Sequence, residues 1–99
     1  MTPKNKKVRN YIFKMRRNRG LAQKQLAFLL GHRYTQMVSK YESGTSLPPL
    51  ETALLLEIAL GIRLSDLYVD LHQNLQHAVV QRSQRLPEEV RRGLLAARG

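Results

Sequence analysis

The sequence contains no cysteine, and none of its apolar runs approaches the roughly 20 residues that a membrane-spanning helix requires. The missing thiols exclude a disulfide framework and any thiolate metal site. His72 and His77 lie five residues apart, which is off the spacing that puts two ligands on one helix face. We therefore expect no metal or other cofactor, and no membrane partner.

Acidic residues are absent from the first 40 positions, and Glu42 is the first carboxylate of the chain. The same stretch carries 11 Lys or Arg, which is more than the whole formal net charge of +10. A cationic field concentrated at one end of a small chain is typical of a protein that binds nucleic acid. An acidic protein would be attracted by the same field, as would an anionic membrane surface, so charge favours nucleic acid without excluding the others.

Carboxylates are too few and too scattered for acid–base catalysis. Neither a nucleophile–base set nor a Gly-rich phosphate loop appears. Glu88 and Glu89 follow Pro87, where they fit the first-turn acids of a last helix. We predict that the chain is not an enzyme.

Apolar residues recur at helical spacing along the chain, and no segment alternates as a strand would. Glycines follow most of these stretches and mark helix ends. The pattern predicts helices near residues 8–19, 23–30, 36–43 and 50–60. A fifth helix follows, with Ser65 as its N-cap. Short connections between helices predict one all-α orthogonal bundle.

The buried face of the helix near 50–60 is predicted to contain Leu50, Ala53, Leu54 and Ile58. Beyond Leu67, an apolar stripe predicts a further helix that extends toward Arg85, followed by a short helix with Pro87 at its first position.

The segment from Gly20 to Pro48 reads as two short helices joined by a tight turn, and a basic helix precedes it. Its ordered positions are Arg16, Gly20, Leu21, Gln23, Leu26, Ala27, Gly31, Val38, Ser39, Glu42, Gly44 and Pro48. With this spacing the chain resembles the Cro/repressor-type (XRE-like) helix-turn-helix family of bacteria and their phages, over about residues 8–70. The resemblance implies a five-helix lambda-repressor-like DNA-binding bundle at 8–70. Residues 1–7 would then be a basic arm, and residues 71–99 a C-terminal helical extension.

The resemblance also implies which residues contact double-stranded DNA. The recognition helix, at about Gln36–Ser43, would enter the major groove, with base contacts expected from Gln36, Met37, Ser39 and Lys40. Phosphate contacts are expected from Gln23, Lys24, Arg33, Tyr34, Thr35 and Thr45. Arg16 and Glu42 match the partly buried ion pair of the family, although two unrelated surface charges would give the same sequence.

Two positions depart from the family pattern. Ala22 stands where the family usually has Thr or Ser as the N-cap of the second helix, so that cap is missing. The turn between Gly31 and Ser39 is one residue longer than the commonest spacing. The register of the recognition helix is therefore defined by the sequence only to within one residue.

The C-terminal extension, residues 71–99, carries an apolar stripe that the minimal five-helix bundle does not need for its own core. We expect a dimer or partner contact from Leu71, Leu75, Val79 and Leu86, since family members bind paired half-sites as two-fold dimers. The same stripe would also fit a tail that folds back on its own domain or one that docks a different protein. The arm, in turn, is either a solvated tail or a segment that contacts phosphate or the minor groove.

These observations favour a sequence-specific transcriptional regulator, a repressor-type DNA-binding protein that acts as a homodimer in the cytoplasm at the nucleoid. The first alternative is an antitoxin that regulates its own promoter and binds a toxin through its tail. A second alternative is a DNA-binding protein with little sequence preference.

Overall fold

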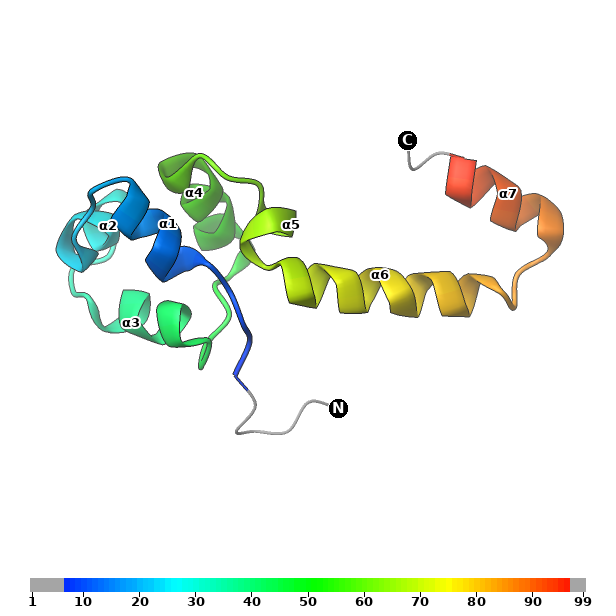
Figure 1. Cartoon of the computed structure of the whole chain (residues 1–99), viewed down its shortest axis with the longest axis horizontal. Helices are drawn as coiled ribbons and strands as arrows, with labels where there is room; N and C mark the ends of the chain where they lie inside the picture. Colours follow the sequence, from blue (N-terminus) through cyan, green and yellow to red (C-terminus); the bar gives the residue numbers. More distant parts are fainter. Residues whose placement is uncertain (1–6, 97–99) are drawn as a thin grey trace.

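The computed structural model describes residues 7–96, and all regular structure in that range is helical, as the sequence predicts. The helices are α1 (Ile12–Asn18), α2 (Gln23–Leu29), α3 (Gln36–Ser43), α4 (Leu50–Leu60), α5 (Leu64–Leu67), α6 (Val69–Ser83) and α7 (Glu88–Ala96). Helices α1–α5 form one bundle and α6 projects from it; the chain then turns back past the far end of α6, so that α7 runs toward the bundle without reaching it (Figure 1). The predicted five-helix bundle with a C-terminal helical extension is therefore confirmed, and α6 begins just before the expected boundary at residue 70.

One hydrophobic core holds the bundle together, and every helix from α1 to α5 contributes to it. Its buried side chains are Ile12, Leu26, Ala27, Leu30, Val38, Tyr41, Leu56, Leu60, Leu67 and Tyr68. Burial raises the pKa of the Tyr68 hydroxyl to about 12, with a smaller contribution from Tyr41. The radius of gyration is 16.5 Å, well above the roughly 12 Å of a compact domain of this size, because α6 and α7 lie outside this core.

The segment from Val8 to Tyr11 is not helical, so the first helix is shorter than the predicted 8–19. The Val8 amide donates to the Gly44 carbonyl at 2.9 Å, and the Tyr11 amide donates to the Leu67 carbonyl at 3.0 Å. The Asn10 side chain accepts from the Ile12 amide at 3.0 Å and thus satisfies the first helical N–H. Tertiary hydrogen bonds therefore take the place of the first predicted turn.

Gly44 ends α3 in the left-handed conformation, with φ of 79°. A Cβ atom at this position would collide with the backbone of Val8. The turn and the close approach of the two segments both require glycine here.

The buried face of α4 differs from the predicted one. Leu50, Leu54 and Ile58 are exposed, with 74%, 46% and 76% of their surface accessible. The core-facing residues are instead Thr52, Ala53, Leu56 and Leu60. The prediction was wrong for three of its four residues because α4 is apolar on nearly all sides, so periodicity alone does not identify the inner face.

Helix α5 begins at Leu64 with Arg63 in the N-cap position, so the prediction of Ser65 as N-cap was wrong. The Leu64 amide instead donates to Oε1 of Glu57 in α4, at 3.0 Å. This carboxylate supplies the cap from another helix. Tyr68 then adopts a non-helical conformation, which separates α5 from α6.

Ala22 occupies the N-cap of α2 in an extended conformation, and no side-chain oxygen caps this end. The side chain of Gln25 reaches back and accepts from the Ala22 amide at 2.8 Å. Half of a capping box is therefore present, and the other half needs a hydroxyl at position 22.

We expect Ala22→Ser to raise the free energy of unfolding by about 0.5–2 kcal/mol, since the new hydroxyl can accept from the free N–H groups of the first turn. Urea denaturation followed by circular dichroism measures the change. Ala22→Val, which adds bulk without an oxygen, is the control and should give no gain. An unchanged or lower stability for the serine variant would contradict this account of the helix end.

Candidate nucleic-acid interface

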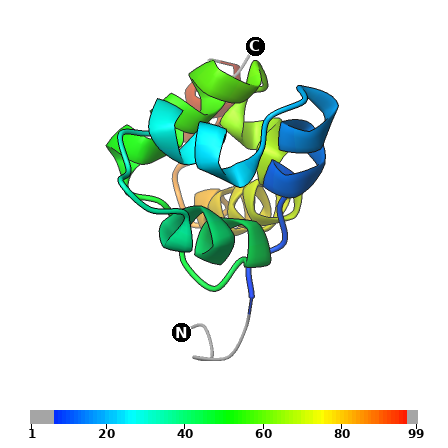
Figure 2. The same cartoon turned by 90° about the vertical axis from the view of Figure 1, so that its left-hand side faces the viewer.

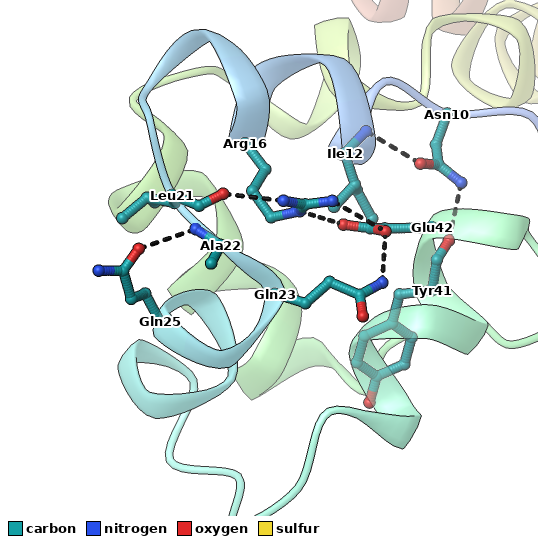
Figure 3. A network of polar contacts seen from close by, with 9 residues as sticks. All are labelled: Asn10, Ile12, Arg16, Leu21, Ala22, Gln23, Gln25, Tyr41 and Glu42. Carbon is teal, nitrogen blue, oxygen red and sulfur yellow. Dashed lines mark hydrogen bonds and ion pairs between the residues drawn. The ribbon is translucent and has the colours of Figure 1, made fainter.

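The ion pair predicted between Arg16 and Glu42 is present and buried. Nε of Arg16 lies 2.5 Å from Oε2 of Glu42, and the two side chains are only 7% and 8% exposed. A second guanidinium nitrogen donates to the Leu21 carbonyl at 2.8 Å. Figure 3 shows these contacts converging between α1, the start of α2 and the end of α3. The alternative of two unrelated surface charges is therefore wrong.

Gln23 joins the same network. Its Nε2 donates to Oε1 of Glu42 at 2.8 Å, so the amide faces the ion pair (Figure 3). Asn10 adds a further link, because its Nδ2 donates to the Tyr41 carbonyl at 2.9 Å. These two roles were not evident from the sequence, since both depend on contacts between residues distant along the chain. The network fixes α3 against α1 and α2.

Helix α3 divides into a buried and an exposed face. Val38 and Tyr41 enter the core, whereas Gln36, Ser39 and Lys40 are exposed. Residues three and four apart share one side of a helix, so these three side chains lie together. Met37, the fourth expected base contact, is half-buried and packs against the core.

The six expected phosphate contacts lie in three places. A recess between α2 and the turn is lined by Lys24, Ala27, Arg33, Tyr34, Thr35 and Gln36. The structure thus brings four of the six expected phosphate contacts beside the first residue of the recognition helix. Gln23 lies at the ion-pair network instead.

Thr45 lies beyond the opposite end of α3. Its hydroxyl donates to the Lys40 carbonyl at 3.2 Å and lies 2.9 Å from the Ser43 hydroxyl. The Thr45 amide also donates to the Lys40 carbonyl, at 3.0 Å. The immediate role of Thr45 is therefore to complete the last turn of the recognition helix.

Only part of the exposed positive charge lies at this face: Lys24, Arg33 and Lys40 lie in or beside α3, whereas Arg19 donates to the Leu60 carbonyl at the end of α4. Among the residues that the structure describes, the exposed bases of the first 40 positions are Lys7, Arg9, Lys14, Arg17, Arg19, Lys24, Arg33 and Lys40. Only Arg9 among them forms an ion pair in this part of the chain, with Asp70 at 3.6 Å. The described chain begins on the α3 side of the bundle in both views (Figures 1 and 2). Most of the predicted arm, residues 1–6, lies outside the described residues.

The four residues of the expected partner face are not equivalent. Leu71 is half-buried and packs against the core of its own bundle. Leu75, Val79 and Leu86 are exposed, with 58%, 42% and 42% of their surface accessible. Part of the stripe therefore completes the domain, and the rest has no cover within residues 7–96.

A family model described as helix-turn-helix matches residues 12–67, which is more than half of the chain. The chain belongs to this family of DNA-binding regulators, and the Cro/repressor-type resemblance seen in the sequence is confirmed. No curated protein and no solved structure was found to match. In the described part of the chain, no helix is long and apolar enough to cross a membrane. No cluster of potential metal ligands occurs among the same residues.

We expect Glu42→Ala to lower the free energy of unfolding by about 3–5 kcal/mol, because it leaves the Arg16 guanidinium buried without a counter-charge. Urea denaturation at low temperature measures the loss. The double variant Arg16→Met, Glu42→Met removes both charges and should recover much of the stability. Equal stability of Glu42→Ala and the parent protein would contradict the role assigned to the pair.

Proposed function

We propose that this protein is a sequence-specific transcriptional regulator that reads the major groove with α3. The observation that carries the proposal is the exposed set Gln36, Ser39 and Lys40 on a helix that a buried ion-pair network holds in place. Gln can bond both N6 and N7 of adenine, and Ser and Lys can reach base edges or phosphate. Met37 would add an apolar contact to a thymine methyl if the groove closes over its exposed part.

The recess beside Gln36 supports a defined docking position. Lys24, Arg33, Tyr34 and Thr35 carry the charge and hydroxyl groups that bind backbone phosphates. Phosphate contacts next to the first base-reading residue fix the register of the helix on the duplex. Gln23 would contribute to phosphate binding through the second hydrogen of its Nε2, whereas Thr45 would first have to release the hydroxyl hydrogen that it donates to the Lys40 carbonyl.

The regulator would act as a homodimer, because two half-sites related by a two-fold axis require two copies of α3. The uncovered apolar residues of α6 and α7 support a protein contact there. With DNA as its target, the protein would work in the cytoplasm at the nucleoid.

An antitoxin function is the second candidate, and the same uncovered residues favour it. Exposed apolar patches on a small protein mark binding surfaces for other proteins. In that case the bundle would bind the promoter while the tail captures a toxin. A stable complex with the product of a neighbouring gene would distinguish the antitoxin from the self-contained regulator.

Selection of bound sites from a random duplex library tests the proposed function. A salt concentration of about 150 mM limits the sequence-independent electrostatic attraction. Enrichment of a palindrome with half-sites one helical turn apart, about 10 base pairs, would support a dimeric sequence-specific regulator. Binding without any enriched sequence would contradict it and indicate a general DNA-binding protein.

We expect Gln36→Ala to weaken binding to the selected site by about 1–3 kcal/mol and to relax base choice at one position of each half-site. Titration of the selected duplex and of single-base variants measures both effects. Gln73→Ala, an exposed amide on α6, is the control and should change neither. Unaltered affinity and specificity of Gln36→Ala would show that α3 reads DNA in another register.

A further inference from the structure

An exposed aromatic ring on α1 contacts two cationic side chains. Phe13 has 52% of its surface accessible. The guanidinium carbon of Arg16 lies 5.1 Å from the centre of its ring, and that of Arg17 lies 5.7 Å from the same point. Arginine stacks on aromatic side chains because the faces of the ring are electron-rich and attract the cation. The ring therefore holds two guanidinium groups close to each other.

The first of these cations locates the ring at the junction of three helices. Arg16 forms the buried ion pair with Glu42 near the end of α3. Gln23, the first residue of α2, donates to the same carboxylate at 2.8 Å (Figure 3). Phe13 and Arg17 are four residues apart and share one side of α1. They therefore lie beside the network that includes Gln23, one of the expected phosphate contacts.

Arg17 differs from the other three bases of α1 in the surroundings of its charge. Arg16 is buried in its ion pair, and Nε of Arg19 donates to the carbonyl of the last residue of α4 at 3.1 Å. Lys14 is directed elsewhere, because its Nζ lies over the ring of Tyr11, 6.0 Å from the centre. Arg17 is exposed, and none of the ion pairs in the described part of the chain includes it. Its charge is thus available to an anion from outside the protein.

We propose that Arg17 binds a backbone phosphate of the DNA duplex next to the site of Gln23, and that Phe13 is the positioning residue that orients the Arg17 guanidinium. A guanidinium can donate two parallel N–H bonds to one phosphate, which a lysine ammonium cannot do. Contacts of this kind fix the position of the protein on the duplex and carry no sequence information. The proposal rests on the proposed function, in which α3 enters the major groove.

The ring prepares Arg17 for this contact in two ways. Stacking on Phe13 limits the conformations of the Arg17 side chain before DNA arrives, so less freedom is lost when the phosphate binds. The ring also lies between like charges in energetic terms, because Glu42 neutralises Arg16 but not Arg17. A phosphate at Arg17 would supply the second negative charge and relieve the repulsion that remains.

Replacement of the base tests the contact, with the full-length protein, the selected duplex and a duplex of unrelated sequence. Arg17→Ala should weaken binding to both duplexes by the same factor, about fivefold at about 150 mM salt, and lower the slope of log affinity against log salt by about 0.9. Lys14→Ala removes the same charge one turn away on α1 and is the matched control, which should leave the slope nearly unchanged. Equal losses for the two variants, or no loss for Arg17→Ala, would overturn the contact.

A double-mutant cycle tests the role of the ring. Phe13→Leu should weaken binding about two- to fivefold, the change that corresponds to one exposed cation–π contact, whereas Phe13→Tyr keeps the ring and should bind as the parent does. In the Arg17→Ala background, Phe13→Leu should have no further effect on affinity. Circular dichroism establishes that each variant is folded under the binding conditions. An undiminished effect of Phe13→Leu in the absence of Arg17 would overturn the positioning role and show that the ring acts through Arg16.

The contact and the proposed function are measured separately. An enriched palindrome that Arg17→Ala binds as tightly as the parent would reject the contact and leave the sequence-specific regulator intact. Loss of affinity and of salt slope in Arg17→Ala without any enriched sequence would reject the regulator and leave the phosphate contact intact.

Discussion

The buried ion pair between Arg16 and Glu42 is the constraint on which the orientation of the recognition helix depends. Moving two charges out of water is costly, and their attraction offsets the cost only when the remaining polar groups are also paired. Here the Leu21 carbonyl and the Gln23 amide complete the hydrogen bonding. Three helices must therefore meet in one arrangement for the pair to be satisfied, and that arrangement turns the polar face of α3 outward.

The sequence predicted this part of the molecule well, because its signals are local or strongly ordered. Glycine positions define helix ends, and the resemblance to the family predicted the Arg16–Glu42 pair, although the roles of Gln23 and Asn10 in the network were not predicted. The inner face of α4 was not predictable, since apolar residues surround that helix and only packing decides which of them are buried. The cap that Glu57 provides for α5 and the extended segment at Val8 depend on contacts between distant parts of the chain, which no local pattern contains.

The helix bundle and the C-terminal extension differ in how much of their apolar surface they bury. The bundle buries apolar side chains from five helices and needs no further cover for its core. Helix α7 and the outer part of α6 bury little, so their apolar residues remain in contact with water in a single chain. The basic surface is concentrated on the bundle, and the uncovered apolar residues of the extension lie beyond it.

The hydrogen bond between Val8 and Gly44 has a mechanical consequence. It fastens the start of the described chain to the end of the recognition helix, and Asn10 adds a second attachment one turn earlier on α3, at Tyr41. The two hydrogen bonds, from Val8 to Gly44 and from Asn10 to Tyr41, therefore couple a displacement of Lys7 to α3. The chain before α1 acts as a tether that limits how far the recognition helix can rotate about its own axis.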